Sequence, residues 1–186
     1  MSKPSEVIVL AEDSRQQQLI RRYLRRCGLE QRMIRLVPCP EGSGSGEQWV
    51  REQFPVEVKA YRNRCRRAKT ALIVIIDADN FSVSERKAQF NRKLDEAQID
   101  CILPAEQIAR LVSRRNIETW ILCLNGRNVH EGTDYSRIAE DWAKLVRLAA
   151  IMLYEWTRPN AQLPVNCIPS LQRGVGELKN LDLQQV

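Results

Sequence analysis

The stretch Ala71-Leu72-Ile73-Val74-Ile75-Ile76-Asp77-Ala78-Asp79-Asn80 decides the fold. Its first six residues are apolar, and four of them are β-branched, which is typical of a strand buried on both faces of a parallel sheet. Successive side chains of a strand alternate sides, so Asp77 and Asp79 point the same way if the extended geometry continues. Ligands of open α/β sheets bind beyond the carboxyl ends of the strands. The stretch therefore predicts two carboxylates at a ligand-binding edge.

Three further segments have the apolar character of buried strands, and helical patterns separate them. They are Val7–Ala11, Met33–Val37 and Ile108–Val112. Strands that alternate with helices indicate β-α-β units and a parallel sheet. We therefore predict an α/β fold with a parallel sheet of about four strands, flanked by helices.

The helices between these strands are predicted from apolar spacing and from residues that begin or end helices. Ser14 is the candidate N-cap of a helix that stops at Gly28, and Ser82-Val83-Ser84-Glu85 has the capping-box pattern. Pro55 is expected to restart a helix, and Asn116 to cap a helix that ends at Asn125-Gly126.

The last third of the chain reads as helical. An apolar period runs from Tyr135 to Trp156, and a short last helix is predicted from Pro169. We expect residues 1–126 to form the α/β domain and residues 127–186 to form a helical extension packed on it.

Composition limits the function classes. The formal net charge of +6 suits nucleic acid without proving such a partner. The six cysteines contain no CxxC pair, and His130 is the one histidine, so we expect neither a zinc site nor a Ser-His-Asp triad. No apolar run reaches membrane-spanning length, and the first residues lack signal-peptide features. We expect a cytoplasmic protein that does not contact membranes.

Acidic side chains follow three of the predicted strands. Glu12 and Asp13 follow the first strand, Asp77 and Asp79 follow the third, and Glu118 lies just past the fourth. Carboxylates gathered at one edge repel each other unless cations neutralise them, so the pattern predicts bound Mg²⁺ or Mn²⁺. An aspartate pair that only caps the next helix is the alternative interpretation.

A metal held by these acids could activate water and polarise a phosphodiester, with Glu12 as general base or further ligand. Arg114 or Arg115 could stabilise the charge that develops on phosphorus. The candidate nucleic-acid-binding residues are Arg15, Arg22, Arg62, Arg66, Arg67 and Arg114. The segment Glu41–Glu47 is interpreted as a flexible connector, since it lacks the Gly-Lys-Ser/Thr of a P-loop.

Glu12 and Asp77-Ala78-Asp79 together resemble the Toprim fold, whose mark is a glutamate after the first strand and a DxD after a later one. The likeness extends to small Toprim-like proteins near the overcoming-lysogenisation-defect nucleases and to related bacterial defence proteins, through Arg115-Asn116-Ile117-Glu118-Thr119-Trp120. It covers roughly residues 6 to 125. It implies Mg²⁺-dependent phosphodiester chemistry, with Glu12, Asp77, Asp79 and Glu118 as the acidic set. We therefore expect Glu12 and Arg115 to be catalytic, Asp77, Asp79 and Glu118 to be metal ligands, and DNA rather than RNA to be the substrate.

Two features leave other functions open. Glu12 is followed by Asp13, whereas the typical Toprim glutamate is followed by glycine, so a Toprim-like subunit that does not cut is the alternative. Nucleases of the overcoming-lysogenisation-defect type also carry an ATPase domain, whereas this chain has no Walker motif, so the resemblance implies a separate ATPase or sensor subunit as a partner. A response-regulator receiver domain fits poorly, because no Lys-Pro turn follows the fourth strand and Gly42–Arg67 makes the second crossover too long.

Overall fold

A computed structural model describes residues 3–40 and 45–184 of the chain. Its sheet contains β1 (Glu6–Ala11), β2 (Ile34–Val37), β3 (Thr70–Asp77) and β4 (Ile108–Ser113). All pairings are parallel, and the strand order is β2-β1-β3-β4. Every residue of β3 is buried, as its continuous apolar sequence requires. The predicted α/β fold with a four-stranded parallel sheet is therefore confirmed.

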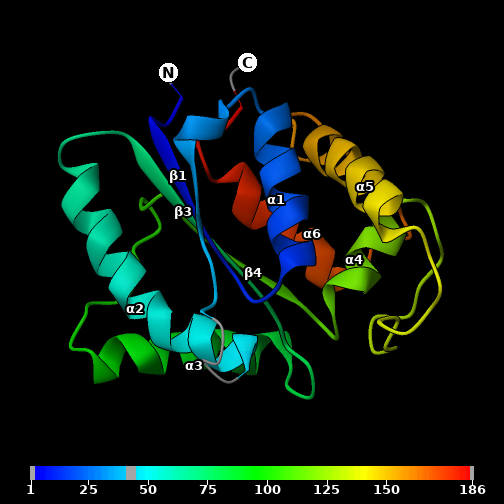
Figure 1. Cartoon of the computed structure of the whole chain (residues 1–186), viewed down its shortest axis with the longest axis horizontal. Coiled ribbons are helices and arrows are strands. Elements are labelled where there is room, and N and C mark those ends of the chain that lie inside the picture. Colours follow the sequence, from blue (N-terminus) through cyan, green and yellow to red (C-terminus); the bar gives the residue numbers. More distant parts are fainter. Residues whose placement is uncertain (1–2, 41–44, 185–186) are drawn as a thin grey trace.

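The helices cover both faces of the sheet (Figure 1). Helices α2 (Gly46–Cys65) and α3 (Val83–Glu96) pack on one face, against side chains such as Ile8 and Leu10 of β1. The opposite face is covered by α1 (Ser14–Arg26), α4 (Ile117–Leu124), α5 (Trp142–Trp156) and α6 (Pro169–Lys179). Alternate residues of each strand thus supply two separate cores, and the molecule has three layers.

The two C-terminal helices are part of the same core as the sheet. Trp120 of α4 is fully buried, and its indole nitrogen donates a hydrogen bond of 2.8 Å to Ser170 of α6. Gly174 of α6 lies directly against the Trp120 ring. Residues 127–184 therefore complete one side of the α/β domain.

Two predicted helix starts are corrected by the structure. The N-cap of α1 is Asp13, whose carboxylate accepts a hydrogen bond of 2.7 Å from the Gln16 backbone, so Ser14 is the first helical residue. Helix α5 begins at Trp142 rather than near Tyr135. Asp141 caps it through the Lys144 backbone, and the preceding residues form turns.

Pro55 does not begin a new helix. Helix α2 runs through it from Gly46 to Cys65, although proline removes one internal hydrogen bond. Phe54 and Val58 are fully buried in one core on either side of the proline, which holds the two halves of the helix in place. The other strands, the capping box at Ser82 and the helix from Pro169 lie where the sequence predicts them.

Within residues 3–40 and 45–184, no helix combines the length and the apolar character needed to cross a membrane. The predicted connector Glu41–Glu47 lies outside them at residues 41–44, while Gly46 and Glu47 open α2.

Candidate functional site

The carboxyl ends of β1 and β3 lie side by side and bring two acidic side chains together. Ala11 pairs in register with Ile75, so the residues that follow the two strands are neighbours. The Oε2 atom of Glu12 accepts a hydrogen bond of 3.1 Å from the backbone nitrogen of Asp77. The predicted meeting of Glu12 with the Asp77 strand end is thus present in the structure. We call Glu12, Asp77 and Asp79 the acidic edge.

Asp77 is the most firmly positioned of these acids. It ends β3 and is only 7% exposed. Its Oδ1 atom accepts a hydrogen bond of 3.0 Å from the amide nitrogen of Gln16 and another from the hydroxyl of Ser113. Gln16 belongs to α1 and Ser113 to β4, so two other elements orient this carboxylate.

The electrostatics of the acidic edge favour a bound cation. The pKa of Glu12 is raised from 4.5 to about 7, chiefly by burial and in part by the nearby charges of Asp79 and Asp13, although the hydrogen bond from the Asp77 backbone opposes the rise. Burial also raises the pKa of Asp77 well above its ordinary value, and the charge of Glu12 adds to the rise. A cation placed between the two carboxylates would reverse both effects.

Asp79 lies in a left-handed turn just beyond β3, with φ of 54°. The extended geometry ends at Asp77, so the strict alternation that would align Asp77 with Asp79 does not continue. The Asp79 side chain is 47% exposed, and Oδ2 lies 3.7 Å from a guanidinium nitrogen of Arg86. Burial raises the pKa of Asp79, while the charge of Arg115 opposes that rise. Asp79 therefore forms the solvent-facing side of the acidic edge.

Arg86 is a buried cation that the sequence did not reveal. It belongs to α3, and its side chain is 1% exposed. Its NH1 atom pairs with Glu47 and donates 2.7 Å to Gln89, and NH2 lies 3.4 Å from the carbonyl of Ala78. Among the described residues its Nε has no hydrogen-bond partner. The local sequence Ser-Glu-Arg-Lys reads as a solvated helix start, so only the sheet's closure places Arg86 inside.

The beginning of α2 packs directly onto the acidic edge. A Cβ atom built on Gly46 would lie 2.5 Å from the carbonyl oxygen of Glu12 and 3.0 Å from its Cγ. Glycine is therefore required at this approach of two backbones. Glu47, the next residue, supplies the carboxylate that pairs with Arg86.

Glu118 does not join the acidic edge as a free ligand. It lies in the first turn of α4, is 4% exposed, and forms an ion pair with Arg15 of α1. The Arg15 guanidinium also stacks over the Trp142 ring, with 4.5 Å to its centroid. The pair joins three helices, which makes it a structural contact and leaves Arg15 less available to a phosphate.

Arg114 and Arg115 lie beside the acidic edge, in the turn after β4. Arg114 donates a hydrogen bond of 2.8 Å to the carbonyl of Phe81 and thereby stabilises the turn after β3. Arg115 donates a hydrogen bond of 2.8 Å to the side chain of Asn80, and its guanidinium lies 3.8 Å from the Asp134 carboxylate. Both are partly exposed, so their remaining donors can face a ligand at this edge.

The other basic candidates are separated from this edge. Arg62 pairs with Glu106 at 2.7 Å and donates to the carbonyls of Asp100 and Cys101. Arg66 and Arg67 follow α2 and line a cavity with residues at the beginning of β1 and β3, at the opposite edge of the sheet. Arg22 lies on the exposed face of α1.

The acidic edge fits a magnesium ion in the chemistry of its donors, although its ligands are not preassembled. Among the described residues, no three His, Cys, Asp or Glu side chains are grouped to hold a metal ion. Mg²⁺ usually binds through one or two carboxylates together with waters and substrate phosphates. Glu12 and Asp77 can each offer a second oxygen, since the hydrogen bonds described above occupy Oε2 and Oδ1. Asp79 can add a third carboxylate.

Fold and site together define a three-layered α/β protein with a carboxylate cluster at the carboxyl edge of its parallel sheet. Comparison of the chain with protein-family models, with curated proteins and with solved structures finds no match to any of them.

Proposed function

We propose that this protein is a metal-dependent phosphodiesterase, a nuclease that acts at the acidic edge. The observation that carries the proposal is the hydrogen bond that the Glu12 carboxylate accepts from the Asp77 backbone, which places two buried acidic side chains together. Burial raises the pKa of both, and the charge of Glu12 raises the pKa of Asp77 further. Such a pair at the carboxyl end of a parallel sheet is the arrangement expected of a ligand site. The Toprim-like motif pattern of the sequence supports the same chemistry.

Each residue has a distinct part in this proposal. Asp77, oriented by Gln16 and Ser113, and the more exposed Asp79 hold Mg²⁺ or Mn²⁺, which supplies Lewis-acid polarisation of a phosphate and an activated water. Glu12, with a pKa of about 7, is suited to take a proton near neutral pH. Arg115 lies close enough to Asp79 to lower its pKa, so it can face a phosphate bound there.

The biological setting follows from the resemblance alone. Small Toprim-like proteins of bacterial defence suggest a role against phage, with DNA as the substrate and with a separate ATPase or sensor subunit as partner. A pull-down from the native host that recovers no second subunit would count against that partner.

A nuclease assay tests the proposed activity. Supercoiled plasmid and single-stranded DNA are incubated with the protein and Mg²⁺ or Mn²⁺, and cleavage is compared between the wild type and Asp77→Asn/Asp79→Asn. We expect metal-dependent cleavage that the double variant lacks. The control Asp95→Asn/Asp100→Asn removes two exposed carboxylates of the same type and should cut normally. Equal cleavage by wild type and Asp77→Asn/Asp79→Asn would refute the assignment.

A subunit that does not cut is the second candidate, and Arg86 is the observation that favours it. Its cation lies beside Asp79 and lowers the pKa of Glu12, so it neutralises part of the acidic edge without a metal. On this alternative, Mg²⁺ raises the melting temperature no more for the wild type than for Asp77→Asn/Asp79→Asn. A larger rise for the wild type favours the nuclease.

A further inference from the structure

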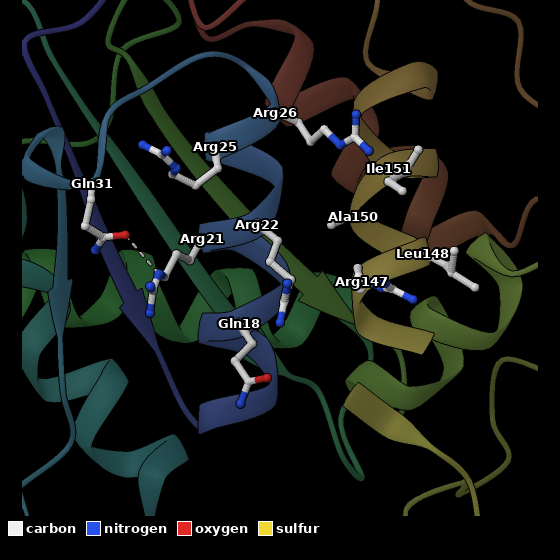
Figure 2. A pocket seen from close by; sticks show the side chains of 10 residues that line it. All are labelled: Gln18, Arg21, Arg22, Arg25, Arg26, Gln31, Arg147, Leu148, Ala150 and Ile151. Carbon is white, nitrogen blue, oxygen red and sulfur yellow. Dashed lines mark hydrogen bonds between the residues drawn. The ribbon is translucent and has the colours of Figure 1, made fainter. Parts of the chain in front are cut away.

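A groove lined by arginines lies between α1 and α5 (Figure 2). Its volume is about 820 Å³. Five of its ten lining residues are arginines and none is acidic, the arginines being Arg21, Arg22, Arg25, Arg26 and Arg147. We call it the arginine groove. Such a concentration of one charge is unfavourable unless counterions or an anionic ligand offset it.

The arginines divide into two groups by their contacts. Arg21 donates a hydrogen bond of 3.1 Å to the side chain of Gln31, and Arg25 donates one of 2.9 Å to the carbonyl of Leu29. Arg22, Arg26 and Arg147 are exposed, and within the described part of the chain no hydrogen bond or ion pair engages their guanidinium groups. Figure 2 shows Arg22 and Arg26 on the side of α1 that faces α5, and Arg147 on α5. These three cations are therefore available to a ligand.

The spacing of these cations suits an extended anion. Arg22 and Arg26 are four residues apart, so they lie on one face of α1 with about 6 Å of helix between them. Arg147 lines the same groove from α5, and Figure 2 shows its side chain extending along that helix. Guanidinium groups bind phosphate oxygens through two parallel hydrogen bonds, which favours several phosphates over a single small anion.

The arginine groove is connected to the acidic edge by α1. This helix begins immediately after Asp13, and Arg22 lies about 12 Å along its axis from Ser14. A phosphate backbone that follows α1 from the groove therefore approaches Glu12. No lining residue of the groove is aromatic, so it offers no platform on which unpaired bases could stack.

We propose that the arginine groove binds the phosphate backbone of a nucleic-acid duplex and places it toward the acidic edge. Arg22, Arg26 and Arg147 contact phosphates and read no base sequence. The inference rests on the proposed nuclease function for the identity of the ligand.

Fluorescence anisotropy of a labelled DNA duplex of roughly 20 base pairs tests this binding. EDTA is present, so that affinity is measured without cleavage. The variant Arg22→Ala/Arg26→Ala/Arg147→Ala is expected to bind at least about tenfold more weakly than the wild type. Each lost phosphate contact lowers the slope of log affinity against log salt by about 0.9, so the slope should fall by about 3.

A matched control separates a local site from general charge attraction. Lys59→Ala/Arg92→Ala/Arg173→Ala removes the same number of exposed positive charges elsewhere and should bind as the wild type does. Equal weakening by both variants, or no binding of the duplex by the wild type, overturns the proposal. Tighter binding of the same sequence as a single strand, or of an acidic peptide, also overturns it.

The two proposals can fail separately. Loss of duplex binding in the groove variant without any metal-dependent cleavage by the wild type retains the groove and rejects the nuclease. Cleavage that depends on Asp77 and Asp79 while the groove variant binds normally retains the nuclease and rejects the groove. Thermal unfolding of each variant, monitored by circular dichroism, shows that the exposed substitutions leave the fold intact.

Discussion

Replacing Glu12 with glutamine is expected to stabilise the folded protein at about pH 8 and to leave its stability nearly unchanged near pH 4. The carboxyl group is largely buried and accepts a hydrogen bond from the Asp77 backbone. Glutamine has almost the same size, and its carbonyl oxygen can accept the same hydrogen bond. The substitution thus removes the charge while it retains the contact.

The magnitude follows from the pKa of Glu12, which is about 7 in the folded protein against an ordinary value of 4.5. Between these values the folded state keeps a proton that the unfolded state has lost, so stability falls as the pH rises from 4.5 to 7. Above pH 7 the ionised Glu12 lowers the free energy of unfolding by the full difference between its two pKa values. At about 1.36 kcal/mol for each pKa unit, this is about 3 kcal/mol. For a chain of this size, that corresponds to a rise of roughly 6–12 °C in Tm for Glu12→Gln.

Urea unfolding in EDTA at several pH values measures this effect. The difference between Glu12→Gln and the wild type should grow from pH 4.5 to pH 7 and then become constant, about 3 kcal/mol in favour of the variant. Glu52→Gln, at an exposed position of α2, should show no such pH dependence. A Glu12→Gln variant that follows the wild-type curve at all pH values would refute the argument that the charge is buried at a cost.

Two further predictions concern packing and a buried ion pair. Gly174→Ala should lower the free energy of unfolding by about 1–3 kcal/mol, because its Cβ would lie 2.3 Å from the Trp120 ring, whereas Gly176→Ala, with open space around it, should raise it by roughly 0.5–1 kcal/mol. Equal stability of the two variants in urea unfolding would contradict this contact. Arg15→Ala should cost about 1–3 kcal/mol, because it leaves the Glu118 carboxylate buried without a partner, and Arg15→Lys should recover part of the loss. Thermal unfolding measures the stability of the two Arg15 variants, and an Arg15→Ala protein as stable as the wild type would show that the ion pair contributes nothing.

The fold was predictable because its strands carry their signal locally. The apolar run before Asp77 and the shorter run at Val7–Ala11 can be buried only as central strands, and the structure places both there within one residue. The start of α5 was not predictable in this way. Apolar residues continue with helical spacing upstream of Asp141, but the capping side chain of Asp141 fixes the beginning of the helix. The spacing of apolar residues does not reveal a cap.

The candidate site was predictable only where sequence position determines location in space. Glu12 and Asp77 directly follow strands, so parallel pairing alone brings them together. Glu118 was predicted at the same edge, but its partner Arg15 is 103 residues away, and only the packing of α1 against α4 and α5 reveals their pairing. Arg86 was missed because a charged residue in the first turn of a helix is usually solvated.

Whether Arg86 alone neutralises the acidic edge can be argued from its contacts. It is paired with Glu47, and its approach to Asp79 is 3.7 Å, longer than a direct hydrogen bond. The pKa of Glu12 stays at about 7 although Arg86 lowers it, which means that burial and the neighbouring carboxylates outweigh that cation. As the pH rises above about 7 and Glu12 loses its proton, its negative charge is therefore not fully compensated by Arg86. A second cation bound at this edge would offset the free energy that the protein loses by burying the charged carboxylates. When the Glu12→Gln experiment is repeated with Mg²⁺, the wild type should therefore gain more stability than the variant.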